Sequence, residues 1–125
     1  MSALRVLLVE DDADNRELMA EVLASSGYEV VSAATGQEGL RTLSESSVDV
    51  VVTDMGMPGM GGLEVAKAAK EIAPTVPVVI VTGYAGREDL SSARGNRQVD
   101  AVLVKPVDPE ALTQTVSDVA HGRGR

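Results

Sequence analysis

Cysteine, phenylalanine and tryptophan are absent from the 125 residues, and histidine occurs only once. Without cysteine the chain has no disulfide framework, no thiolate metal ligand and no thiol nucleophile. The single histidine, His121, lies next to a tail rich in glycine and arginine, which disfavours histidine-based triads and multi-histidine metal sites. Any chemistry is therefore expected from carboxylates, hydroxyls and amines.

Basic charge and long apolar runs are also scarce. The formal net charge of -8 disfavours direct contact with nucleic acid, and the missing aromatic residues remove the usual platforms for stacking bases. No apolar run approaches the roughly 20 residues that span a bilayer, and no signal peptide is visible. We expect a cytoplasmic protein without membrane contact.

The chain does contain a regular alternation of two kinds of segment. Five short runs, at 4–9, 29–33, 48–53, 78–82 and 101–104, have the composition of β-strands. Segments with helical spacing separate them, which is typical of βαβ units and a parallel sheet. We expect an α/β fold with a doubly wound parallel sheet. We expect a single domain over residues 1–125, with a core over about 4–120 and a frayed tail at 121–125.

Four helices follow from start signals and apolar stripes. Capping-box spacing predicts the first two, from Asp14 with Glu17 and from Thr35 with Glu38. A third is expected over 62–73, and the last begins with a cap at Asp108 followed by proline. The stripes expected to face the core are Leu18, Met19, Val22 and Leu23 in the first helix, Leu40 and Leu43 in the second, Leu63, Ala66, Ala69 and Ile72 in the third, and Leu112, Val116 and Val119 in the last.

The run at 48–52 is the most informative stretch. Four of its five residues are valine, so it suits a strand buried on both sides in the middle of a parallel sheet. It leads to Asp54, after which Gly56 and Pro58 mark a loop. Core packing does not explain an acid at the exit of a buried strand, and open α/β sheets bind ligands at this edge. Asp54 is therefore the predicted reactive centre.

Three consecutive acids, Glu10, Asp11 and Asp12, follow the first predicted strand and leave the sheet at the same edge as Asp54. Backbones of neighbouring strands lie roughly 4.8 Å apart. Two carboxylates about 5 Å apart repel by roughly 3 kcal/mol at an effective dielectric near 20, which favours a bound cation. Oxygen ligands suit Mg²⁺, with Ca²⁺ as the alternative. The alternative to any metal site is a solvated turn in which Asp12 or Asp14 caps the helix.

Two polar residues end the fourth and fifth predicted strands. Thr82 could be only a good strand former, and Lys105 only a solvated charge. At the acidic edge, however, Lys105 can pair with Asp54, and Pro106 favours a fixed peptide bond, trans or cis, that aims the lysine. An acid nucleophile, metal-binding acids, a hydroxyl and an amine together suit phosphoryl transfer to a carboxylate.

With these residues in this order, the chain resembles the response-regulator receiver domains of two-component signalling. The resemblance covers residues 4 to about 120 and implies the flavodoxin-like sheet order 2-1-3-4-5 with helices on both faces. The motifs that carry it are Glu10-Asp11-Asp12, Asp54 followed by Met57-Pro58, Thr82-Gly83 and Lys105-Pro106.

The resemblance also implies roles for individual residues. Asp54 would accept a phosphoryl group from the phosphohistidine of a sensor histidine kinase or a phosphotransfer protein, with Thr82 as the switch hydroxyl and Lys105 as the phosphate-pairing cation. Magnesium would be held by Asp11, Asp12, Asp54 and the backbone carbonyl of Gly56. The implied protein is a phosphorylation-controlled switch that catalyses only its own phosphorylation and dephosphorylation. Its partners would include a downstream effector or output domain, and the face formed by the fourth helix, fifth strand and fifth helix offers a surface for oligomers.

Several positions depart from the family pattern. Val102 stands where the family carries an aromatic switch residue, so coupling from Thr82 to the output face is expected to be altered. Gly61 stands where many members have aspartate. Between residues 84 and 99 we expect only a short fourth helical segment, because Gly95 interrupts a weak apolar stripe. Tyr84 is expected to govern water access and hence the lifetime of the phosphorylated state.

Three other functions remain as alternatives. A phosphatase or phosphotransferase with an aspartyl intermediate would need a second acid two residues after the nucleophile, where Gly56 stands. A flavin- or nucleotide-binding domain would need a phosphate-binding loop after the first strand, where the chain has three acids. A receiver that acts only as a docking module is consistent with Val102.

Overall fold

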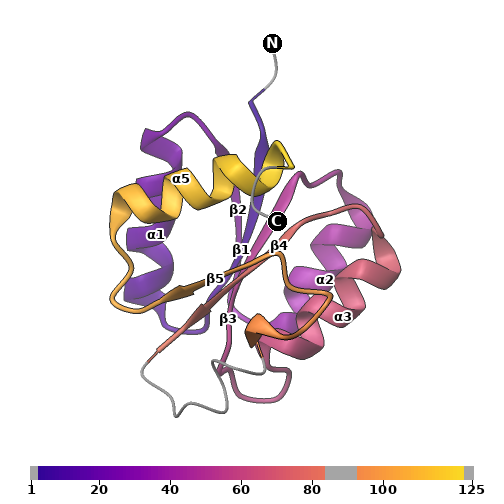
Figure 1. The fold of residues 1–125 in the computed structure, drawn as a ribbon. Coiled ribbons are helices and arrows are strands. Elements are labelled where there is room, and N and C mark those ends of the chain that lie inside the picture. Colours follow the sequence, from indigo (N-terminus) through magenta and orange to yellow (C-terminus); the bar gives the residue numbers. More distant parts are fainter. Residues whose placement is uncertain (1–2, 84–92, 123–125) are drawn as a thin grey trace.

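The computed structural model describes residues 3–83 and 93–122 (Figure 1). Within them a parallel sheet has the strand order β2-β1-β3-β4-β5, which confirms the predicted class and order. The strands are β1 Arg5–Val9, β2 Glu29–Ala33, β3 Val50–Asp54, β4 Val78–Thr82 and β5 Ala101–Val104.

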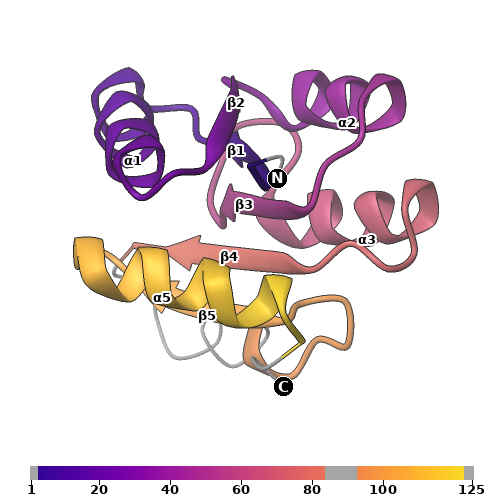
Figure 2. The same ribbon diagram turned by 90° about the horizontal axis from the view of Figure 1, so that it is seen from above.

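Helices cover both faces of the sheet. The described helices are α1 Ala13–Ser25, α2 Gly36–Glu45, α3 Gly62–Ile72 and α5 Pro109–Ala120. Figure 2 shows α1 and α5 on one face and α2 and α3 on the other. The expected fourth helical segment falls largely on residues 84–92, outside the described residues. None of the described helices has the length and apolar character that crossing a bilayer requires.

The pleat of the strands divides the core into two layers. In β1, Val6 and Leu8 pack with α1 and α5, whereas Leu7 and Val9 pack on the side of α2 and α3, and all four are fully buried. Every residue of β3 and β4 is buried, as the valine-rich runs predict. The strand face under α1 and α5 continues, beyond the carboxyl ends of the strands, into a group of polar residues.

Several predicted boundaries and stripes are wrong. β3 begins at Val50 and includes Asp54, and α1 begins at Ala13 with Asp12, not Asp14, as its N-cap. Leu18 and Ile72 are 59% and 43% exposed, whereas Met19, Leu23, Ala66 and Ala69 of the same stripes are buried. The predicted buried run 101–104 is only half-buried and ends in exposed Val104, because β5 is an edge strand.

The caps of two other helices match the sequence signals. Thr35 Oγ1 accepts a hydrogen bond from the Glu38 amide at 3.1 Å at the start of α2, although the Glu38 carboxylate reaches the amide of Ala34 at 3.5 Å and not that of Thr35. Asp108 Oδ2 accepts from the Ala111 amide at 3.0 Å at the start of α5. Local chemistry therefore fixes where both helices begin.

Candidate functional site

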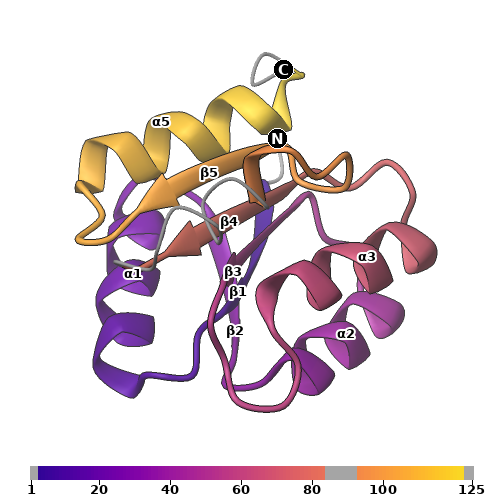
Figure 3. The same ribbon diagram turned by 60° about the horizontal axis from the view of Figure 1, so that its bottom comes forward.

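Polar residues converge where the parallel strands end. Val9 of β1 pairs with Thr53 of β3, so the residues that follow, Glu10 and Asp54, stand side by side. Side chains alternate along a strand, so Glu10 continues the face of Leu8, on the side of α1 and α5. Asp54 follows Val52 on the same face, and Lys105 follows Leu103 there as well. Figure 3 shows β4 and β5 ending at the same edge of the sheet.

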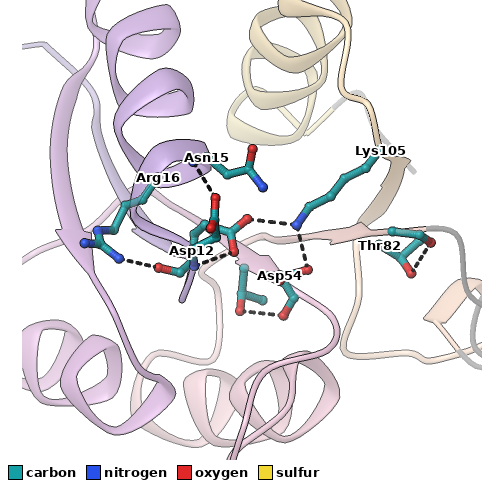
Figure 4. A network of polar contacts seen from close by, with 9 residues as sticks. Asp12, Asn15, Arg16, Asp54, Thr82 and Lys105 are labelled. Atoms are coloured by element: carbon teal, nitrogen blue, oxygen red, sulfur yellow. Dashed lines mark hydrogen bonds and ion pairs between the residues drawn. The ribbon is translucent and has the colours of Figure 1, made fainter.

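Lys105 joins the two carboxylates. Its Nζ donates to Glu10 Oε1 at 2.9 Å and forms an ion pair with Asp54 Oδ1 at 3.3 Å (Figure 4). Glu10 is 1% exposed and Asp54 8% exposed, so the ammonium is the charge partner of two largely buried acids. The structure therefore brings Asp54 and Lys105 together. The peptide bond before Pro106 is cis, one of the two forms considered from the sequence.

Burial and charge shift the proton affinities of this pair. Burial raises the pKa of the Glu10 carboxyl, and the hydrogen bonds from Lys105 and the Asp12 amide only partly offset that effect. Burial alone would lower the pKa of Lys105, but the hydrogen bond to Glu10 and the negative charge of Asp54 outweigh it and raise this pKa. Lys105 is therefore a firmly protonated cation at neutral pH.

The same edge offers an oxygen-only ligand set. Carboxylate oxygens of Glu10, Asp11 and Asp54 all lie within 4.8 Å of one another. Neighbouring ligands in an octahedral Mg²⁺ site stand about 3 Å apart, so these oxygens would move inward to hold the ion. Three carboxylates and the Lys105 ammonium carry a net charge of -2, which a divalent ion would balance. The residues therefore fit a hard divalent cation.

Asp12, predicted as a metal ligand, lies in a different setting. Its Oδ2 accepts a hydrogen bond from the Asn15 amide at 2.9 Å and caps α1, so the capping role considered as an alternative is the one seen (Figure 4). The group formed with Asp11 and Asp54 includes Glu10 in its place. Glu10 stands two residues after Leu8, on the face that also carries Asp54, but this becomes visible only once the register of β1 against β3 is known.

Thr82 is buried at the end of β4, but its hydroxyl is directed elsewhere. In this structure its Oγ1 donates to the Gly83 carbonyl at 3.2 Å and not to Asp54 (Figure 4). Its backbone carbonyl accepts from the Lys105 amide at 2.8 Å. Thr82 is thus tied to Lys105 through the backbone.

The remaining predicted positions are Gly56, Val102 and Tyr84. Gly56 is exposed in the loop after β3, and Val102 is half-buried on β5. Tyr84 lies outside the described residues. Arg16, which the sequence analysis did not single out, donates from Nη1 to the Glu10 backbone carbonyl at 2.9 Å. No short sequence signal marks that contact, because it depends on how α1 leaves the first strand.

Comparison with known proteins agrees with this geometry. A family model described as the response regulator receiver domain matches residues 6–117. The chain is 38% identical over 113 residues to the transcriptional regulatory protein GlrR of Escherichia coli (strain K12), covering 90% of this chain and 25% of that protein. It is 35% identical over 118 residues to the sensor histidine kinase RcsC of Salmonella typhi, covering 94% of this chain and 12% of that protein.

Solved structures give the same result. The chemotaxis protein CheY4 of Vibrio cholerae is 31% identical with a TM-score of 0.85, and the match covers 94% of this chain and 99% of that one. A response regulator receiver domain protein from Clostridium thermocellum is 30% identical with a TM-score of 0.87, covering 94% of each chain.

The fold, together with Glu10, Asp54 and Lys105 at the carboxyl ends of the strands, defines a flavodoxin-like signalling domain. The chain belongs to the response regulator receiver domain family of two-component systems. Receiver domains are signalling switches, and this chain spans only a quarter or less of the first two relatives named above.

Proposed function

We propose that this receiver domain accepts a phosphoryl group on Asp54 from the phosphohistidine of a sensor histidine kinase or a phosphotransfer protein. The observation that carries the proposal is the Lys105 ammonium, held 3.3 Å from Asp54 Oδ1 and 2.9 Å from Glu10 Oε1. A carboxylate beside a fixed ammonium and an oxygen-only ligand set has what phosphoryl transfer needs, namely an acceptor and positive charge around it.

In the proposed transfer, an Asp54 oxygen bonds to phosphorus while the bond from phosphorus to the donor imidazole nitrogen breaks. The imidazole keeps that electron pair and takes up a proton from water. Lys105 would neutralise charge on the phosphoryl oxygens. The Thr82 hydroxyl, now donating to the Gly83 carbonyl, would turn toward the new oxygens. Because the Thr82 carbonyl accepts from the Lys105 amide, the loops after β4 and β5 would respond together.

Magnesium is the proposed cofactor. Glu10, Asp11 and Asp54 would hold it, with the Gly56 carbonyl as the backbone ligand, and we assign to Glu10 the place expected for Asp12. When bound, the ion supplies positive charge that stabilises the transferring phosphoryl group. Calcium remains the competing ion.

The proposed partners follow from the relatives. One is a sensor histidine kinase and another a transcriptional regulatory protein, so a kinase or phosphotransfer protein on one side and an effector or output domain on the other are proposed here. The domain would catalyse only its own phosphorylation and dephosphorylation. Direct nucleic-acid contact by this domain is disfavoured by its charge of -8.

The test is incubation with acetyl phosphate, with and without Mg²⁺, followed by intact mass measurement. We expect one added phosphoryl group that requires Mg²⁺ and is lost in Asp54→Asn. Asp118→Asn, which removes an acid on α5, is the matched control and should be phosphorylated like the wild type. Addition to Asp54→Asn at the wild-type rate, or no addition to the wild type, would overturn the proposal.

A further inference from the structure

Arg16 spans the turn that carries the acids of the first strand. Its side-chain Nη1 donates to the Glu10 carbonyl at 2.9 Å (Figure 4), and its backbone amide makes the first helical hydrogen bond of α1, to the Asp12 carbonyl at 2.9 Å. The two carbonyls belong to the residues on either side of Asp11. The Arg16 side chain therefore holds the backbone before that acid, and the first turn of α1 holds the backbone after it.

Asp11 depends on its backbone more than its neighbours do. Glu10 is buried, its amide donates to the Ala33 carbonyl at 3.1 Å, and its Oε1 accepts from Lys105. Asp54 is buried at the end of β3. Asp11 is the exposed member of the three-acid group, so core packing does not set its position. What sets it is the path of the chain between Glu10 and Asp12.

We propose that Arg16 is a positioning residue for the divalent-cation site, acting by holding Asp11 in reach of Glu10 and Asp54. The inference rests on the proposed function, because it assumes that these acids take up Mg²⁺. Arg16 is half-buried, and its guanidinium suits this task. It is a permanent cation with several donors in a fixed fork, so it can bind a carbonyl without competing as a metal ligand.

The direction in which Mg²⁺ affinity changes when Arg16 is replaced distinguishes a positioning role from a purely electrostatic one. Removing a cation beside a metal site should strengthen Mg²⁺ binding if only electrostatics matter. Losing the support of Asp11 should weaken it. Arg16→Met keeps most of the apolar stem but removes both the charge and the donors. We expect it to bind Mg²⁺ about 10-fold more weakly, the lower end of what loss of a supporting contact costs a metal site.

Isothermal titration of the wild type, Arg16→Met, Arg16→Lys and Arg41→Met with MgCl₂ tests this. Arg41→Met removes an exposed arginine on α2 and should bind like the wild type. Arg16→Lys keeps a charged donor and should fall between the wild type and Arg16→Met. Phosphorylation by acetyl phosphate should need more Mg²⁺ in Arg16→Met but reach a near-wild-type rate at saturation.

Each outcome decides a separate question. Equal or tighter Mg²⁺ binding by Arg16→Met, or the same weakening in Arg41→Met, would overturn the positioning role while leaving the proposed function intact. Absence of Mg²⁺ uptake by the wild type would overturn the proposed function and this inference with it. If circular dichroism shows that Arg16→Met is unfolded, Arg16→Lys decides, and wild-type affinity in that variant counts against the proposal.

Discussion

Replacing Lys105 by methionine should cost stability that a divalent cation restores. At an effective dielectric near 20, gross attraction is roughly 6 kcal/mol at the 2.9 Å distance to Glu10 and roughly 5 kcal/mol at the 3.3 Å distance to Asp54. Desolvation cancels most of this attraction in the intact protein. Removing one partner of a buried ion pair costs about 3–5 kcal/mol, because the remaining charge stays buried and unpaired.

The lysine side chain is 24% exposed, so water screens part of the interaction. We therefore expect the low end of that range, about 3 kcal/mol, for Lys105→Met in the absence of divalent ions. Saturating Mg²⁺ should recover at least half of the loss, because the ion no longer shares Glu10 and Asp54 with an ammonium. Free Mg²⁺ at 100 times its Kd stabilises the folded state by about 2.7 kcal/mol, which is large enough to measure.

Urea unfolding in EDTA and in Mg²⁺, for the wild type and the variant, gives the four free energies required. Lys67→Met, which removes an exposed lysine on α3, is the control and should leave stability unchanged in both buffers. The reasoning fails if Lys105→Met costs less than about 1 kcal/mol in EDTA, the level of an exposed pair. It also fails if Mg²⁺ stabilises the variant no more than the wild type.

Three further outcomes are expected. The pKa of Lys105 is raised on folding, so the protonated lysine stabilises the folded state. This contribution is complete below the ordinary lysine pKa near 10.4 and is lost as the pH rises through the pKa of the folded state. In urea unfolding at alkaline pH, the difference in stability between the wild type and Lys105→Met should therefore disappear. Gly62→Ala would place a methyl group 2.5 Å from the Asp54 carbonyl and should cost about 2 kcal/mol in urea unfolding, whereas Gly56→Ala, with no atom within 4 Å, should cost far less. Glu10→Gln keeps the size of the side chain but should weaken Mg²⁺ binding about 10-fold by titration calorimetry, and wild-type affinity would remove Glu10 from the ligand set.

The sequence predicts the architecture well because strong, redundant signals specify it. Short, valine-rich runs without a polar face favour buried strands, and their alternation with helical segments leaves few topologies. The contact between Lys105 and Asp54 was also predictable. All parallel strands end at one edge, so a cation and an acid that each follow a buried run are brought together there.

Register and face are harder to predict, and they decide which acid serves the site. Three consecutive acids look equivalent in the sequence. The pairing of Val9 with Thr53 puts Glu10 beside Asp54, whereas Asp12 comes late enough to cap α1. A shift of one residue would exchange the two faces of the strand, and composition alone does not exclude that shift.

The contact of Arg16 and the exposure of Leu18 could not be predicted for a different reason. The contact from Arg16 to the Glu10 carbonyl depends on the angle at which α1 leaves the sheet, which local propensity does not set. The exposure of Leu18 depends on which part of its stripe the sheet and the neighbouring helix cover. Both are properties of tertiary packing, and a periodic stripe predicts only that one face of a helix is covered.

The shared lysine couples the two proposed ligands of this site. Lys105 stands closer to Glu10 than to Asp54, at 2.9 Å against 3.3 Å. A phosphoryl group on Asp54 would add nearly two negative charges and draw the ammonium away from Glu10. Glu10 is almost fully buried, so it would then need another cation to remain ionised. Phosphorylation should therefore tighten Mg²⁺ binding, and by linkage Mg²⁺ should favour the phosphorylated state by the same factor.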